Sequence, residues 1–289
     1  MNKKRPPNTP EVITSIDGVR VPHDKAVISV YDNSFLYAQG LFETFLGIGE
    51  RVLFEKDHLD RLWRGAKVID LTIPCTRTQL SRWMKEILQS HPSRTKKLRL
   101  TVTAGDSARW LGRTSPSRVI LSVGSVDLPT RPFDLFISKL RVDHRSMLRR
   151  IKTVSYALQA TALKEAKLAG ADDALLLNEA ERVAEVTSAN VFWVRNEKVY
   201  TPSLDEGCLD GVTRRKVFAV CKKLRVPILE KKGSMRELQA ADEIFISSSL
   251  KLVVGVRSIQ NRKQNFSYPA GPITARLEAE FRAMIERMV

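Results

Sequence analysis

The segment KTVSYALQATALKEAKLAGADDALLLN, residues 152–178, contains a complete change from helix to strand. Residues 157–170 predict a helix that ends at Gly170, because glycine readily adopts the left-handed conformation that closes a helix. The run ALLL (174–177) predicts a short strand directly after it. A helix and a strand are therefore joined by only a few residues in the middle of the chain.

The sequence after this segment is rich in short strands and contains few helices. Strands are predicted at VFWV (191–194), VY (199–200), VPILE (226–230), EIFIS (243–247) and VVGV (253–256). Helices are predicted near 213–224, at MREL (235–238) and at residues 272–288, where Pro272 stands near the start. Many strands follow one another without a helix between them, which favours an α+β fold over a doubly wound parallel sheet.

The sequence before the segment predicts a separate α and β region. A hairpin is expected around Asp17-Gly18, and a second one within residues 41–54. AVISV (26–30), residues 97–105, RVILSV (118–123) and LFISKL (135–140) predict further strands, while apolar residues at helical spacing predict helices within 59–69 and 80–88. We expect a loose arm (1–10), a small domain (11–126), a linker (127–134) containing two prolines, and a large domain (135–289).

The net charge of +16 is the one unusual bulk property of the 289-residue chain. Such a charge can attract nucleic acids or other anions. The basic residues are spread over the whole sequence, however, and the densest clusters contain no interleaved aromatic residues that could stack on bases. A generally basic surface is therefore favoured over a nucleic-acid-binding function.

The remaining composition indicates a cytoplasmic globular protein. Hydrophobic residues make up 43% of the chain, and no apolar run approaches the length that spans a bilayer. No secretory signal is recognised at the N-terminus. Cys75, Cys208 and Cys221 are odd in number and lack the spacing of metal ligands, so no metal site is predicted and a reducing compartment is expected.

Six sequence blocks, in this order, resemble the class IV aminotransferases, which are the fold-type IV enzymes that use pyridoxal 5′-phosphate (PLP). The blocks are YAQGLFET (37–44), HLDRL (58–62), residues 152–178, EVTSANVFWV (185–194), TPSLDEGCLDGVTRR (201–215) and DEIFISSSLKLVVGV (242–256). The resemblance covers roughly residues 12–285. It implies a small α/β domain, a larger domain with a mixed, barrel-like sheet, and a homodimer.

Lys152 is the residue that the resemblance assigns to the covalent bond with PLP. The cofactor requires an amine with which it forms a Schiff base, and the released amine can then carry a proton to and from the substrate α-carbon. The alternative is that Lys152 is one surface residue among the 48 lysines and arginines of the chain.

Glu185 matches the carboxylate that partners the pyridine nitrogen of the cofactor. A negative partner keeps this nitrogen protonated, which lets the ring accept electrons. The alternative is an exposed glutamate at a strand end. Glu181 is the nearest competing carboxylate, and we expect it to be solvated.

Arg61 in HLDRL matches the arginine that binds the phosphate group in the family. Its planar guanidinium suits phosphate oxygens. The alternative is a surface helix arginine that pairs with Asp57 or Asp60. Two further groups match the phosphate site, and each could instead be purely structural: a helix start at Gly211, Val212 and Thr213, and a serine pair at Ser248 and Ser249.

Three other residues complete the expected site. Tyr156 matches a tyrosine that commonly touches the phenolic oxygen of the cofactor, although it could be a core residue. Arg109 lies where the family often binds the carboxylate of the substrate. Asn190 is expected to support the loop after Glu185 through local hydrogen bonds.

The sequence leaves the reaction type open. The blocks LFETF, ANVFW and TPSLDEGCLDGVTRR lean towards aminodeoxychorismate lyase, which eliminates pyruvate from aminodeoxychorismate to give 4-aminobenzoate. No residue is needed by a lyase alone, and transamination between an amino acid or amine and a keto acid is the commoner activity of the family. We therefore place an aminotransferase slightly ahead of a lyase. A third hypothesis, a non-catalytic binding protein, is opposed by the presence of both Lys152 and Glu185.

Overall fold

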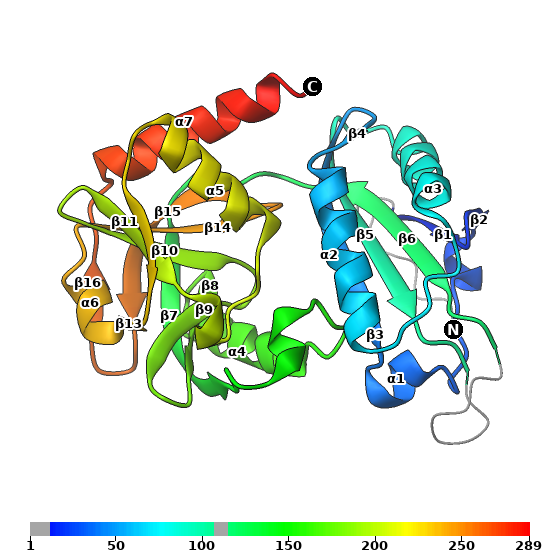
Figure 1. The fold of residues 1–289 in the computed structure, drawn as a ribbon, viewed down its shortest axis with the longest axis horizontal. Coiled ribbons are helices and arrows are strands. Elements are labelled where there is room, and N and C mark those ends of the chain that lie inside the picture. The colour runs from blue at the N-terminus through cyan, green and yellow to red at the C-terminus, as the bar shows by residue number, and fades with distance from the viewer. Residues whose placement is uncertain (1–11, 107–114) are drawn as a thin grey trace. The chain divides into compact units, whose positions relative to one another are not determined.

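The computed structural model describes residues 12–106 and 115–289, and these residues form two compact units (Figure 1). The first unit extends to Asp127 and includes Val289, and the second unit runs from Leu128 to Met288. The expected N-terminal arm, residues 1–10, lies outside the described residues.

The first unit is built on a six-stranded sheet in which every pairing is antiparallel. Strands β3 and β5 pair over their full length, and alternate side chains of β5 point into the core. The two predicted hairpins are present as β1–β2 and β3–β4. The strand order is β2 (Val19–Val21), β1 (Ile13–Ile16), β6 (Val119–Ser125), β5 (Thr95–Thr103), β3 (Gly40–Ile48) and β4 (Arg51–Val52).

Two amphipathic helices pack on this sheet. Helix α2 (Glu55–Val68) packs against β3, and helix α3 (Arg77–Gln89) packs against β1, β4, β5 and β6. Both helices were predicted from the spacing of apolar residues, and in both most of the apolar residues are buried, although Val68 at the end of α2 is exposed. The short helices η1 (His23–Lys25) and α1 (Asn33–Tyr37) precede β3.

The predicted strand at 26–30 is wrong. Residues 26–30 adopt no regular structure and pair with no strand of the described chain. Together with α1 they form an exposed apolar segment, residues 27–37. Its members Val27, Val30, Tyr31, Phe35 and Tyr37 are each more than half exposed. These exposed side chains therefore do not pack into the core of the first unit.

The second unit is built on a ten-stranded mixed sheet that is bent into a nearly closed barrel. Strands β15 and β7, β7 and β8, and β11 and β12 pair in parallel, whereas the other neighbours are antiparallel. The order is β12 (Ile228–Lys231), β11 (Lys198–Pro202), β10 (Asn190–Arg195), β14 (Glu243–Ser248), β15 (Leu252–Gln260), β7 (Phe133–Val142), β8 (Asp173–Asn178), β9 (Arg182–Val186) and β13 (Gly233–Ser234), with β16 (Asn265–Ser267) beside β15.

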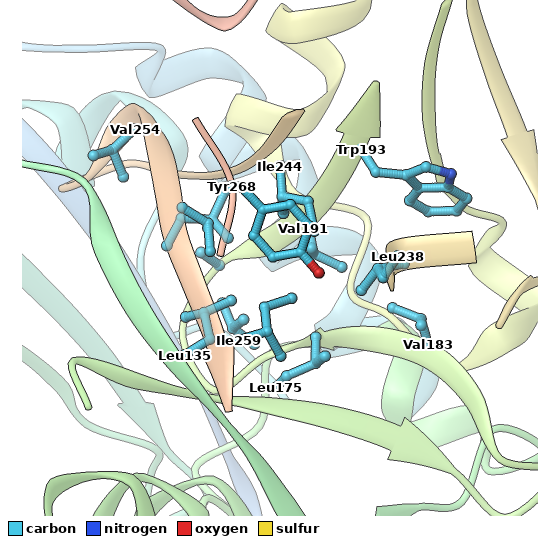
Figure 2. Packing of buried hydrophobic residues seen from close by; sticks show 14 of the residues in the cluster. Leu135, Leu175, Val183, Val191, Trp193, Leu238, Ile244, Val254, Ile259 and Tyr268 are labelled. Carbon is cyan, nitrogen blue, oxygen red and sulfur yellow. The ribbon is translucent and has the colours of Figure 1, made fainter. Parts of the chain in front are cut away.

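The interior of the barrel is filled by apolar side chains, including those of strands near opposite ends of the strand order (Figure 2). Val183 on β9 and Trp193 on β10 belong to one buried cluster with Leu135, Ile244 and Ile259. Strand β9 also approaches β10 and β11 across the sheet. This shared core explains the curvature, because a flat sheet of this width could not bury both ends in one cluster.

Helices cover the outside of the sheet. Helix α4 (Ala157–Leu168) packs on β7 and β8 through small residues such as Ala162 and Ala166, which allow a close approach. Helices α5 (Val212–Lys223) and α7 (Pro272–Glu286) contact each other and β14, and α7 also contacts β15 (Figure 1). The short helices η2 (Met147–Arg150), η3 (Leu204–Glu206) and α6 (Met235–Gln239) complete the unit. The predicted α+β fold with a barrel-like sheet is confirmed. Within the described chain, no helix is long and apolar enough to cross a membrane.

Candidate active site

Lys152 lies in the short loop between η2 and α4. Its side chain is half-buried, and its Nζ atom lies 5.5 Å from the centre of the Tyr156 ring. Tyr156 is the N-cap residue of α4, and its hydroxyl donates a 2.6 Å hydrogen bond to the carbonyl oxygen of Thr187. Tyr156 is therefore fixed at both ends, by the helix and by the turn at Thr187.

Glu185 is a buried carboxylate on β9, and both of its oxygens accept hydrogen bonds. Oε1 accepts from the guanidinium of Arg149, and Oε2 accepts from the backbone N–H of Leu209 at 2.8 Å. Arg149 lies on η2, three residues before Lys152, so this ion pair holds the segment that leads into the Lys152 loop against Glu185. The exposed strand-end alternative for Glu185 is wrong, because only 9% of its side chain is exposed.

Glu181 has the surroundings of a surface residue. Its side chain is 65% exposed, and it forms a two-point contact with Arg141. The hydrogen bond from Arg141 lowers the pKa of Glu181, and burial acts in the opposite direction. Of the two candidate carboxylates, Glu185 is thus the buried one.

The start of α5 is tied to Glu185 through the loop before it. Asn190 donates a 2.8 Å hydrogen bond from Nδ2 to the carbonyl oxygen of Leu209, whose own N–H is bound by Glu185. Gly211 is the N-cap of α5, and a Cβ atom at this position would lie 2.1 Å from Oδ1 of Asn190. Glycine is therefore required here for a close approach between the helix start and β10.

Two buried hydroxyl groups near this helix start have no hydrogen-bond partner within the described chain. One is Oγ1 of Thr213 in the first turn of α5, and the other is Oγ of Ser247. Ser247 pairs across the sheet with Asn190, whose side chain contacts Gly211. Buried hydroxyls are normally bonded, so this pair suits a ligand with strong acceptors. The first turn of α5 has no acidic residue, and its positive end favours an anion.

The predicted serine pair lies one residue further along the chain. The hydroxyl of Ser248 accepts a 3.2 Å hydrogen bond from the backbone N–H of Lys251, in the turn between β14 and β15. Ser249 lies in the same turn and is half-buried. Ser247 was not singled out from the sequence, because three successive serines offer no signal for which hydroxyl is buried.

Arg61 lies in the core of the first unit, bound to Glu43 of β3. Nε and Nη2 of Arg61 donate hydrogen bonds of 2.8 and 2.7 Å to the two oxygens of Glu43. Nδ1 of His58 lies 2.8 Å from Oε2 of the same carboxylate. The alternative of a surface arginine is wrong, because only 7% of the Arg61 side chain is exposed.

The pKa of Glu43 results from two opposing effects. Complete burial pushes its pKa upward, but the Arg61 guanidinium and His58 outweigh burial and hold the pKa well below its usual range. Glu43 is therefore ionised, and it holds the guanidinium of Arg61 in one orientation.

Two further expectations concern the substrate arginine and a metal site. Arg109 lies outside the described residues. Within residues 12–106 and 115–289, no group of three His, Cys, Asp or Glu side chains could hold a metal ion.

Comparison with known proteins identifies the family. The family model described as amino-transferase class IV matches residues 40–259, which is most of the chain. The chain therefore belongs to the class IV aminotransferase family, a family of enzymes.

Individual relatives carry the names of both candidate activities. A putative branched-chain-amino-acid aminotransferase of Methanocaldococcus jannaschii is 28% identical over 92% of this chain and 94% of the relative. An aminodeoxychorismate lyase of Bacillus subtilis is 26% identical over 95% of both chains.

Solved structures agree with this assignment. A branched-chain aminotransferase of Thermoproteus uzoniensis, solved with norvaline, is similar with a TM-score of 0.87 and 26% identity, over 94% of each chain. A branched-chain amino acid aminotransferase of T.th., solved with pyridoxamine 5′-phosphate, has a TM-score of 0.85 and 26% identity, over 94% of this chain and 93% of the other.

Proposed function

We propose that this protein binds PLP covalently through Lys152 and transfers an amino group between an amino acid or amine and a keto acid. The observation that carries the proposal is the ion pair between Arg149 and Glu185. It joins the loop of the candidate amine to a buried carboxylate, and PLP enzymes need both groups at one site.

The residues present fit the chemical groups of PLP. Lys152 offers an amine for the aldehyde, and Glu185 offers an anion for the pyridine nitrogen. The start of α5, with Gly211, Val212 and Thr213, offers a positive helix end and an unpartnered buried hydroxyl for the phosphate.

Each side chain has a separate task in the proposed mechanism. Bound PLP would supply an electron sink for the negative charge that develops on the substrate α-carbon. The neutral amine of Lys152 would take the proton from that carbon and return a proton during transfer. Glu185 would hold a proton at the pyridine nitrogen, while Arg149 and the Leu209 N–H keep its carboxylate in place. The Tyr156 hydroxyl would contact the phenolic oxygen.

The family resemblance supports four further roles. Arg61, Ser248 and Ser249 would bind the phosphate, and Arg109 would bind the carboxylate of the substrate. The relatives named as branched-chain aminotransferases make branched-chain amino acids the first donors to test.

The second candidate function is aminodeoxychorismate lyase. The observation that favours it is the B. subtilis relative of that name, which matches along 95% of its length. The lyase would use the same lysine, carboxylate and phosphate site, so only the reaction distinguishes the two functions.

A spectroscopic experiment tests the proposed site. The purified protein with added PLP should absorb in the violet, as a cofactor bonded to a lysine does. Lys152→Ala should abolish this band and the activity. Glu185→Gln should lower kcat by roughly 100-fold, because it removes a preorganised charge. Glu181→Gln is the matched control and should leave kcat unchanged. A protein that stays colourless with PLP, or a fully active Lys152→Ala variant, would refute the proposal.

A second experiment separates the two reactions. The protein is mixed with a panel of L- and D-amino acids and amines, and formation of the pyridoxamine form of the cofactor is followed. In parallel, pyruvate release from aminodeoxychorismate is measured. We expect members of the panel to convert the cofactor to its pyridoxamine form, and we expect no pyruvate release from aminodeoxychorismate. The reverse result would establish the lyase.

We also propose that the protein is a cytoplasmic homodimer. The exposed apolar segment, residues 27–37, supports dimer formation, because monomeric proteins rarely leave so many large apolar side chains in water. All three cysteines are free thiols, which is typical of a reducing compartment.

A further inference from the structure

A cluster of polar side chains lies directly behind Tyr156. At its centre is Asp173, the first residue of β8, which is only 2% exposed. Its Oδ1 atom accepts hydrogen bonds from the hydroxyl of Thr187 and from the N–H of Ala174, and its Oδ2 atom accepts one of 3.2 Å from the hydroxyl of Ser188. Asp173 therefore holds the two residues that turn the chain from β9 into β10.

Lys251 supplies the positive charge of this cluster. Its Nζ atom lies 3.2 Å from Oδ2 of Asp173 and donates a 2.5 Å hydrogen bond to the hydroxyl of Ser188. Only 16% of the Lys251 side chain is exposed. A buried carboxylate is costly unless a cation compensates it, and Lys251 is a cation in direct contact with Asp173.

The cluster connects to Lys152 through one further contact. The carbonyl oxygen of Thr187 accepts the hydrogen bond of the Tyr156 hydroxyl, and the Tyr156 ring lies beside Nζ of Lys152. At its other end, Lys251 belongs to the turn of Ser248 and Ser249, since its N–H is bonded to Ser248. Lys251 thus joins the Thr187–Ser188 turn, which orients Tyr156, to the turn of Ser248 and Ser249. In the proposed function, Tyr156 contacts the ring of PLP and the two serines bind its phosphate.

We propose that Lys251 is a positioning residue, which through Asp173 and the Thr187–Ser188 turn fixes the Tyr156 phenol beside Lys152. The inference rests on the proposed function, in which the phenol contacts the cofactor. Without the ammonium group, the turn loses a donor at Ser188 and a counter-charge at Asp173, and the carbonyl that orients Tyr156 is no longer fixed. Lys251 itself has no contact with the reacting atoms in this proposal.

The test is a double-mutant cycle on the PLP-loaded protein. Lys251→Met keeps the length of the side chain but removes its charge. It should lower kcat roughly tenfold, with a smaller change in KM, because the Thr187 carbonyl would no longer hold the Tyr156 phenol in one position. It should also shift the pH midpoint of the visible cofactor band in the same direction as Tyr156→Phe. Lys251→Arg should restore most of kcat.

The cycle separates positioning from a general structural effect. In the Tyr156→Phe background, Lys251→Met should change kcat by less than about twofold, because the phenol that it positions is gone. Lys223→Met is the matched control, since Lys223 pairs with the partly buried Glu280 on α7. This control should leave kcat and the band unchanged.

A double variant controls for failure to fold. Asp173→Asn combined with Lys251→Met leaves no unpaired buried charge, so it should fold even if Lys251→Met does not. A double variant with wild-type kcat and a wild-type midpoint of the cofactor band would overturn the inference. A tenfold loss of kcat on adding Lys251→Met to the Tyr156→Phe variant would also overturn it. A wild-type protein without any cofactor band would overturn the proposed function as well, which distinguishes the two failures.

Discussion

Glu43 has no contact with solvent, and its charge is balanced by side chains from a different element. Arg61 and His58 lie on α2, while Glu43 lies on β3, so the contact fixes the helix to the sheet. The two residue groups belong to the sequence blocks YAQGLFET (37–44) and HLDRL (58–62), which carry the family resemblance. Their direct contact was not predicted, because nothing in a spacing of 18 residues indicates which side chains meet.

We expect Glu43→Gln to destabilise the first unit by about 3–5 kcal/mol, because it leaves the buried Arg61 without a counter-charge. The free energy of unfolding can be measured with a chemical denaturant. Asp60→Asn is the control, since Asp60 pairs with Lys56 and Arg77 at the surface, and it should have little effect. Equal destabilisation by the two variants would contradict this expectation.

The ion pair between Glu43 and Arg61 also predicts that stability depends on pH. The pKa of Glu43 is lower in the folded state than in the unfolded chain, so unfolding in acid takes up a proton at this residue. Its contribution to stability is therefore present above about pH 4.5 and is lost as the pH falls towards the folded-state pKa. The difference in unfolding free energy between wild type and Glu43→Gln should shrink as the pH falls from 6 to 3. A constant difference would contradict the assigned charge.

At the scale of elements, the sequence predicted most of the longer helices and strands, and two of the segments that it misjudged show why it failed. The strand at 26–30 is absent because its apolar residues find no partner strand. Strand β9 was not predicted, although it carries Glu185. Its sequence RVAEV follows polar residues and contains two charges, so local preference does not reveal that four of its five residues are buried. Tertiary contacts decide both cases.

The start of α5 depends on the absence of a side chain at Gly211. We expect Gly211→Ala to raise the dissociation constant of PLP by roughly 10- to 100-fold, because the new Cβ would displace Asn190 or the helix start. PLP binding can be titrated by absorbance. Gly255→Ala on β15 is the control, since its Cβ would meet the nearest atom at an ordinary 3.7 Å. An unchanged dissociation constant for Gly211→Ala would exclude the helix start from the phosphate site.

At the scale of the whole molecule, two features of the sequence indicated the fold class. Many predicted strands follow one another without a helix between them, and six blocks resemble a known family. It did not reveal the order of the strands. In the second unit, β7 lies between β15 and β8, although β15 follows it in sequence by more than a hundred residues. Such pairings depend on contacts between distant segments, which periodicity cannot report.

The exposed apolar segment carries the prediction about assembly. Phe35→Lys should convert a dimer into a monomer of 32.7 kDa, because it places a charge within the proposed interface. Sedimentation equilibrium measures the mass. Leu168→Lys is the control, since Leu168 is also a highly exposed apolar residue but lies on α4, outside the segment. A wild-type protein that is monomeric at micromolar concentration would refute the proposed dimer.

The parallel pairing of β7 with β15 also has a consequence for synthesis on the ribosome. The first unit's sheet is complete once residue 125 has emerged, so this unit can fold while the rest of the chain is still being made. Strand β7 emerges next, but one of its edges stays unpaired until residues 252–260 are synthesised. During that interval an open strand edge can pair with other chains. We therefore expect association with other chains, or binding by a chaperone, mainly while the second unit is being synthesised.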